Sequence, residues 1–298
     1  MTKNILIESA KDLAQDVGNS VDIIDRDRAL PKPIVNAIAD AGLFRLLVPK
    51  SIGGAEMAFP DFLSIVRTFA EVDGSTGWCI NQNNIFATVS ASMDKNTAEE
   101  IWRDVRTVVT NGPPSSATAT VDGDGYRLTG RWNFSSGFNH ATWIAAVAPI
   151  PSHSTTVEEN VMTLLLPKSE VQPLDTWQVN GLRGTGSFSF EIKDVYIPKT
   201  RTFSRSIPHE NGPLYLIPMT LMFASGFATV ALGIARSALD AIIHISNVKT
   251  NDAGKLIKYR PTVQMDIGKA EAKWRSANAF LTDTVSNTWT RVSTRKQL

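Results

Sequence analysis

The sequence predicts an α+β protein with three consecutive regions: helical over residues 1–108, antiparallel strands over 109–208, and long helices over 209–298. Three observations predict this order. Apolar side chains recur at helical spacing in the first region, alternate with polar ones in the second, and return to helical spacing after His209. A chain of 298 residues can bury more than one core, so we expect two or three domains.

The clearest helix of the first region follows Pro60, a residue that the first turn of a helix tolerates. Its apolar positions are i, i+3, i+4, i+7 and i+8, the spacing of one buried face: Phe62, Ile65, Val66, Phe69 and Ala70. A second helix is expected after the turn at residues 73–78, where Ser75 or Thr76 would serve as the N-cap.

Alternation with a period of two marks the strands of the middle region. Residues 122–125 read Asp-Gly-Asp-Gly, which predicts a hairpin turn. Apolar and polar side chains alternate in the strand that follows, and again over residues 188–193. The apolar positions are Tyr126, Leu128 and Trp132 in the first strand and Phe188, Phe190 and Ile192 in the second.

The last region contains two expected long helices. One seam steps by four and three residues, as in a helical bundle: Val263, Ile267, Ala270, Trp274, Ala277, Leu281 and Val285. The other helix falls within residues 214–235, which carry no charged side chain and are long enough to span a bilayer. Pro218, Gly226 and Gly233 lower its hydrophobicity, and no aromatic belt flanks it. We therefore expect a buried bundle helix and no membrane span.

Composition excludes several other classes of protein. The net charge of +1 offers no basic footprint for nucleic acid. The single Cys79 excludes an internal disulfide, fits a reducing cytoplasm and is expected to be a buried, inert thiol. The four histidines form no i, i+4 pair and lie near no cluster of cysteines or carboxylates, so no metal site is expected. The N-terminus does not resemble a secretory signal, and we expect a cytoplasmic protein.

The segment GRWNFSSGFNHATW, residues 130–143, is the most informative for function. It places aromatic side chains, two hydroxyls and a glycine at the end of the predicted strand. Aromatic faces, hydroxyls and free backbone N–H groups suit an isoalloxazine, which has an apolar edge and polar N5 and O4 atoms. The alternative is a packed β core, because aromatic residues on strands usually bury one another.

Five segments, taken in order, resemble the acyl-CoA dehydrogenase superfamily and most closely its flavin-dependent monooxygenases: residues 41–54, 71–79, 130–143, 177–198 and 231–241. The resemblance implies an N-terminal α domain, a central antiparallel β-barrel and a C-terminal helical bundle. It also implies non-covalent FAD or FMN, a small-molecule substrate, a separate flavin reductase and a homodimer or homotetramer.

The same resemblance implies which residues contact the flavin. Phe134 and Ser136 match positions that lie against the ring, and a serine before the glycine resembles the group that steadies the flavin–oxygen adduct. Ser136 is thus the leading catalytic candidate, with an ordinary turn hydroxyl as the alternative. Ser135 and Trp132 are second choices, since only one set of alternating side chains can face the ring.

The loop at residues 181–186, Gly-Leu-Arg-Gly-Thr-Gly, precedes a strand and opens no helix, which excludes a nicotinamide-dinucleotide fingerprint. We expect Arg183 and Thr185 to lie near the flavin or its phosphates. The alternative for Arg183 is a surface ion pair.

Residues 81–84 read Asn-Gln-Asn-Asn where some monooxygenases of this branch carry a catalytic histidine. Amides can orient an oxygen species but cannot exchange a proton near neutral pH. We expect Asn83 to face the cavity, with a polar helix face as the alternative. Phe86, Phe223 and Phe227 are expected to line a dry substrate pocket.

Two enzyme activities compete, and a catalytic base separates them. An acyl-CoA dehydrogenase needs a glutamate base, and Phe223 stands where some members place it. The resemblance implies that other members carry this base near the C-terminus, beyond Leu298. Monooxygenation is therefore favoured over α,β-desaturation. Family members carry two further long helices, so a fragment that only binds a partner is a third hypothesis. A bundle of two helices would leave an apolar stripe exposed and favour association.

Overall fold

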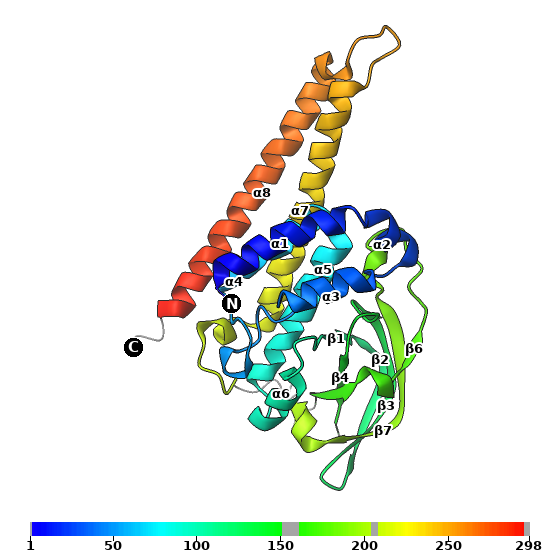
Figure 1. Ribbon diagram of the computed structural model, residues 1–298, viewed down its shortest axis with the longest axis vertical. Helices are drawn as coiled ribbons and strands as arrows, with labels where there is room; N and C mark the ends of the chain where they lie inside the picture. The colour runs from blue at the N-terminus through cyan, green and yellow to red at the C-terminus, as the bar shows by residue number, and fades with distance from the viewer. Residues whose placement is uncertain (1, 151–160, 204–207, 295–298) are drawn as a thin grey trace.

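The computed structural model of the protein describes residues 2–150, 161–203 and 208–294 (Figure 1). The α+β class predicted from the sequence is confirmed: helices come first, strands follow, and two long helices close the chain. Six helices form the N-terminal part: α1 (Lys3–Gly18), α2 (Val21–Asp27), α3 (Lys32–Asp40), α4 (Phe59–Ala70), α5 (Gly74–Ala87) and α6 (Lys95–Trp102). They lie over the sheets on one side (Figure 1).

Helices α4 and α5 form for the reasons that the sequence indicates. Pro60 occupies the first turn of α4, and all five apolar residues of its predicted face are buried. The cap of α5 differs from the expectation. Asp73, rather than Ser75 or Thr76, accepts the first free N–H, from Thr76, at 2.7 Å.

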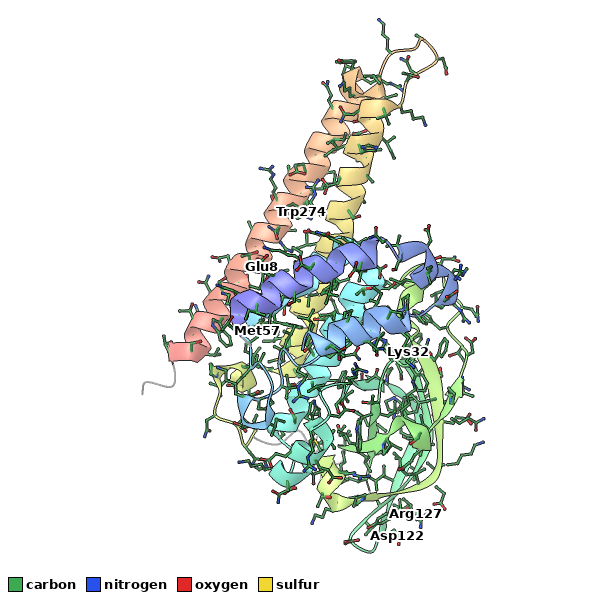
Figure 2. All side chains as sticks on the ribbon, in the orientation of Figure 1. Glu8, Lys32, Met57, Asp122, Arg127 and Trp274 are labelled. Atoms are coloured by element: carbon green, nitrogen blue, oxygen red, sulfur yellow. The ribbon has the colours of Figure 1, made fainter. Side chains whose placement is uncertain are left out.

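The strands form two four-stranded sheets in the orders β1-β4-β5-β8 and β2-β3-β7-β6. Their bounds are β1 (Val109–Gly112), β2 (Pro114–Asp122), β3 (Gly125–Ser135), β4 (Trp143–Pro149), β5 (Val161–Pro167), β6 (Gln172–Leu174), β7 (Phe188–Pro198) and β8 (Thr202–Phe203). The expected hairpin joins β2 to β3 and lies at the tip of the sheet, beside Asp122 and Arg127 (Figure 2). Side chains from both sheets share one core, which includes Leu128, Ile144 and Leu164.

One strand pair departs from the antiparallel expectation. β1 runs parallel to β4, with Val109 opposite Trp143, while the other paired strands are antiparallel. The β2–β3 hairpin of the other sheet lies between β1 and β4 in the chain. It provides the long crossover that a parallel pair requires.

Glycines bring α4, α5 and α7 (Met219–Val248) close together. A Cβ on Gly77 of α5 would lie 2.7 Å from Ala70 Cβ, and one on Gly233 of α7 would lie 2.6 Å from the same atom. Neither position has room for a side chain. The first long C-terminal helix therefore packs directly on the N-terminal helices.

Helices α7 and α8 (Pro261–Thr294) lie side by side, and their far ends project beyond the rest of the molecule (Figure 1). Trp274 of the predicted seam donates its indole N–H to the Leu232 carbonyl of α7 at 2.8 Å. The Arg236 guanidinium lies over the Trp274 ring and pairs with Glu271. By length and hydropathy alone α7 would pass as a membrane span, but it packs against α4, α5 and α8 as a helix of the folded bundle.

Candidate active site

A cavity of about 410 Å³ opens between α5, α7, the ends of β1 and β3, and the loop at residues 177–187. Apolar and aromatic side chains form most of its wall, with a few hydroxyls and amides among them. The lining residues are Trp78, Gln82, Phe86, Asn111, Pro113, Phe134, Ser136, Trp177, Leu182, Thr185, Ser187, Phe223 and Phe227. Apolar walls with a few convergent polar groups are typical of a small-molecule site.

Four aromatic rings form one side of this cavity. Trp78 of α5 stacks on Phe227 of α7, with ring centroids 4.6 Å apart and planes 7° apart. Phe223 lies 5.8 Å from Phe227 and 5.1 Å from Phe86. Phe86, Phe223 and Phe227, expected to line a substrate pocket, thus lie together on this wall.

Phe134 reaches the cavity because β3 bulges just before its end. The register with β7 shifts between Trp132 and Ser135, and Phe134 adopts φ of 57° in the left-handed region. That conformation is unfavourable for a bulky side chain and recurs at functional sites. A bulge also re-aims the side chain it carries. Phe134 is 63% exposed, contacts Trp177 edge to face and lines the cavity.

Ser136 lies at the end of β3, where its hydroxyl joins the two sides of the cavity. The Trp78 indole N–H donates to Ser136 Oγ at 2.8 Å, and Ser187 Oγ lies 2.9 Å from the same atom. Its backbone carbonyl accepts from Thr110 Oγ1 at 2.6 Å. Ser136 therefore occupies one fixed position in the wall.

The four amides of residues 81–84 point in four directions, because successive helical residues are about 100° apart. Asn84 bridges backbone groups of Leu43, Leu46 and Ile80. The Asn81 carboxamide lies against Gly226 of α7, and neither polar atom has a hydrogen-bond partner among the described residues.

Asn83 does not line the cavity, in contrast to the expectation. Its Nδ2 donates to the Val109 carbonyl at 3.0 Å, and its Oδ1 lies 3.1 Å from His140 Nε2. Because the amide N–H groups of Asn83 face carbonyls, its oxygen accepts and His140 carries the proton on Nε2. The pair lies beneath Gly137, where a Cβ would meet both side chains at 2.8 Å.

Gln82 is the polar residue of α5 that lines the cavity, and the sequence analysis did not select it. Its Oε1 is buried without a hydrogen-bond partner within residues 2–150, 161–203 and 208–294. A buried amide oxygen without a partner requires an explanation, and a ligand in the adjacent cavity would provide one. The signal that could have identified it is spacing: Gln82 lies one turn after Trp78 and one turn before Phe86.

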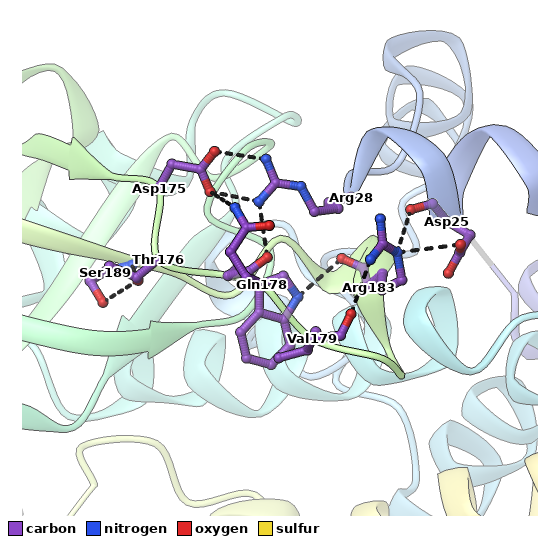
Figure 3. Close-up of polar contacts among 9 residues, drawn as sticks. Asp25, Arg28, Asp175, Thr176, Gln178, Val179, Arg183 and Ser189 are labelled. Atoms are coloured by element: carbon purple, nitrogen blue, oxygen red, sulfur yellow. Dashed lines mark hydrogen bonds and ion pairs between the residues drawn. The ribbon is translucent and has the colours of Figure 1, made fainter.

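Three residues expected near the flavin do not line this cavity. Trp132 is fully buried in the core between the sheets, and Ser135 is buried behind the cavity wall, close to Gly112. Arg183 donates to the carbonyls of Asp25 and Val179 and pairs with the Asp25 carboxylate, as Figure 3 shows. The surface ion pair given as the alternative for Arg183 is the arrangement observed. By contrast Thr185, from the same loop, lines the cavity.

The described residues contain no group of three or more His, Cys, Asp or Glu side chains that could hold a metal ion; His153 lies outside them. Cys79 is buried, and burial raises the pKa of its thiol well above the ordinary range. The thiol is therefore protonated and unreactive, as expected.

Comparison with known proteins places this chain in a family. Residues 2–101 match the model of the acyl-CoA dehydrogenase N-terminal domain, and residues 225–298 match that of the C-terminal domain. The chain is 31% identical to indole-3-acetate monooxygenase of Pseudomonas putida, over 90% of this chain and 69% of the relative. It is 32% identical to the oxygenase subunit HsaA of a flavin-dependent monooxygenase of Mycobacterium tuberculosis, over 86% of this chain and 68% of that relative.

Solved structures agree. The crystal structure of the M. tuberculosis HsaA monooxygenase superposes with a TM-score of 0.88 at 26% identity, covering 98% of this chain and 78% of that one. XiaF from Streptomyces sp., in complex with FADH2 and glycerol, superposes with a TM-score of 0.87 at 22% identity, covering 98% and 76%.

Proposed function

The chain belongs to the acyl-CoA dehydrogenase superfamily, close to its flavin-dependent monooxygenases, and from this premise we propose that it hydroxylates a small aromatic substrate with reduced flavin and O2. When bound, reduced flavin supplies the electrons that split O2, so that one oxygen atom enters the substrate and the other leaves as water. HsaA is an oxygenase subunit, and we propose a separate reductase as the partner of this chain too. Because the chain has one cysteine, we also propose a cytoplasmic location.

The single observation that carries this proposal is the chemistry of the cavity wall. Its lining, within the part of the chain that the structure describes, contains aromatic rings, hydroxyls and amides but no carboxylate. Desaturation of an acyl-CoA requires a base at the α carbon, and Phe223 cannot act as one. A dry aromatic wall instead protects a reactive oxygen species from water.

We assign the residues by their position in the cavity. Phe134 and Ser136 contact the flavin, FAD or FMN, which is held without a covalent bond, and Thr185 acts on Ser136 through Ser187. Phe86, Phe223 and Phe227 hold a planar substrate, and the unpaired Gln82 Oε1 accepts a hydrogen bond from its polar substituent. Hydroxyls and aromatic faces fit the polar and apolar edges of an isoalloxazine. This assignment gives no role at the flavin or the substrate to Trp132, Ser135, Arg183 or Asn83.

The first prediction tests the reaction. Mixed with flavin reduced by a separate reductase, with O2 and with a panel of phenols and indoles, the protein is expected to yield a hydroxylated product. Mass spectrometry with ¹⁸O2 should find one ¹⁸O atom in that product. Anaerobic bleaching of bound oxidised flavin by an acyl-CoA would favour desaturation instead. A folded protein that binds neither FAD nor FMN would favour the partner-binding hypothesis.

We also propose that the protein is a homo-oligomer that buries an apolar stripe of α7. Apart from Phe227, which belongs to the cavity wall, the large apolar side chains that recur along this helix are 40–62% exposed: Leu221, Ile234, Ile242, Ile245 and Val248. A contiguous apolar surface of this kind marks an interface. Burying each such side chain contributes roughly 1.5–3 kcal/mol.

The second prediction follows from that stripe. Sedimentation at micromolar concentration is expected to give a dimer or tetramer, and the double variant Ile234→Lys, Ile242→Lys should be a monomer with unchanged helix content. A lysine ammonium group that is buried in the interface without an opposite charge is unfavourable, so the subunits should separate. Val121→Lys, at a 67% exposed position on β2, is the matched control and should leave the oligomer intact. A monomeric wild-type protein would refute the proposed interface.

A further inference from the structure

Ser136 begins a row of three hydroxyl groups that runs along the cavity wall to Thr185. Ser136 Oγ lies 2.9 Å from Ser187 Oγ, which lies 2.7 Å from Thr185 Oγ1. Thr185 Oγ1 lies 2.8 Å from the carbonyl oxygen of Leu182. The three hydroxyl residues are at most 6% exposed. Each hydroxyl has one proton to donate, so the row has a limited number of possible arrangements.

The two ends of the row determine the direction of every bond within it. A carbonyl can only accept, so Thr185 donates its proton to Leu182. Ser187 must then donate to Thr185, and Ser136 to Ser187. At the other end the Trp78 indole N–H can only donate, and it occupies one lone pair of Ser136 Oγ. Ser136 therefore keeps one lone pair and no proton for the cavity.

We infer that this row makes Ser136 a hydrogen-bond acceptor toward the cavity and thereby selects reduced over oxidised flavin. The inference rests on the proposed function, because the distinction lies in the isoalloxazine. Its N5 atom carries a proton in the reduced ring and is a bare acceptor in the oxidised ring. As an acceptor, Ser136 can take a hydrogen bond from the N5 proton of the reduced ring. Toward the oxidised ring it would present an oxygen lone pair to the lone pair of N5, which is unfavourable. Ser187 and Thr185 act as positioning residues, since they set the orientation of another group's proton.

Two variants change the direction of the row without removing Ser136. Ser187→Ala deletes the acceptor of the Ser136 proton, which is then free to turn to the cavity. Thr185→Val keeps the shape of the side chain but leaves the Ser187 proton free to point to Ser136, with the same result. In both variants Ser136 can donate to oxidised flavin.

The controls are chosen on the same elements. Ser189 of β7 lies two residues after Ser187, is equally buried and hydrogen-bonds to Thr176 (Figure 3). It also donates to Asn133 Oδ1, and neither partner lines the cavity. Ser189→Ala therefore removes a comparable hydroxyl without altering the row. Thr185→Ser retains the hydroxyl and should retain its direction.

The experiment measures the dissociation constants of oxidised and reduced FAD and FMN, under anaerobic conditions, for the full chain and each variant. Ser187→Ala and Thr185→Val are expected to lower the preference for the reduced form about five- to tenfold, the effect of one hydrogen bond. Ser189→Ala and Thr185→Ser should keep the wild-type preference. If the wild type binds flavin but neither variant alters the ratio, the inference is overturned. If the wild type binds no flavin, the proposed function fails and the inference with it.

Discussion

Replacing Trp132 with alanine is expected to lower the free energy of unfolding by about 3–5 kcal/mol, the range for an aromatic side chain removed from a core. Trp132 is fully buried and stacks on Phe190 with centroids 5.2 Å apart. Its indole N–H donates to the Val147 carbonyl of the facing sheet at 2.9 Å. The substitution removes the stacking, leaves a cavity and leaves that carbonyl without its donor. Chemical denaturation followed by far-UV circular dichroism, which reports secondary structure, measures the change in unfolding free energy.

Phe134→Ala, two residues along the same strand, is the matched control. Phe134 is 63% exposed and lines the cavity, so its loss should change the unfolding free energy by less than about 1 kcal/mol. The same variant should weaken flavin binding about tenfold through lost aromatic contact. If instead Trp132→Ala abolished flavin binding in a protein of wild-type stability, Trp132 would be a cofactor residue and the proposed site would be misplaced.

These two residues also show where sequence reasoning succeeded and where it stopped. Alternation correctly predicted a half-buried strand from Tyr126 to Trp132, because each side of β3 meets a constant environment over that stretch. It could not predict the bulge that follows. A bulge inserts one residue and reverses the direction in which the following side chains point. The aromatic residue that β3 contributes to the cavity is therefore Phe134 and not Trp132.

The residues of α5 illustrate a second limit. Their amide composition indicated that a polar group would face the cavity, but composition does not give the rotation of the helix. The rotation is set by Gly77 against Ala70 and by Asn84 on the backbone of residues 43–46, contacts between segments distant in the chain. Given that rotation, Gln82 faces the cavity and Asn83 faces His140. The row of hydroxyls also could not be predicted from the sequence, because it forms only where the end of β3 meets the loop before β7.

Acidification is expected to destabilise the wild-type protein through His140. Burial first, and the nearby charge of Lys168 second, lower the pKa of His140 to about 3. In the unfolded chain a histidine titrates near about 6.5. The folded state therefore keeps His140 neutral while the unfolded state gains a proton, so stability is full above the unfolded pKa and falls as the pH drops toward the folded one. Between pH 7 and pH 5 this linkage removes about 2 kcal/mol, and about 4 kcal/mol by pH 3.

His140→Gln should remove that part of the acid sensitivity. A glutamine can still donate to Asn83 Oδ1 but cannot bind a proton, so its unfolding free energy should fall about 2 kcal/mol less than that of the wild type between pH 7 and pH 5. At pH 7 the variant loses the stacking of the imidazole on Phe44, so only the slopes are compared. His244→Gln, on an exposed part of α7, should keep the wild-type slope. Equal slopes for His140→Gln and the wild type would show that His140 is protonated in the folded protein.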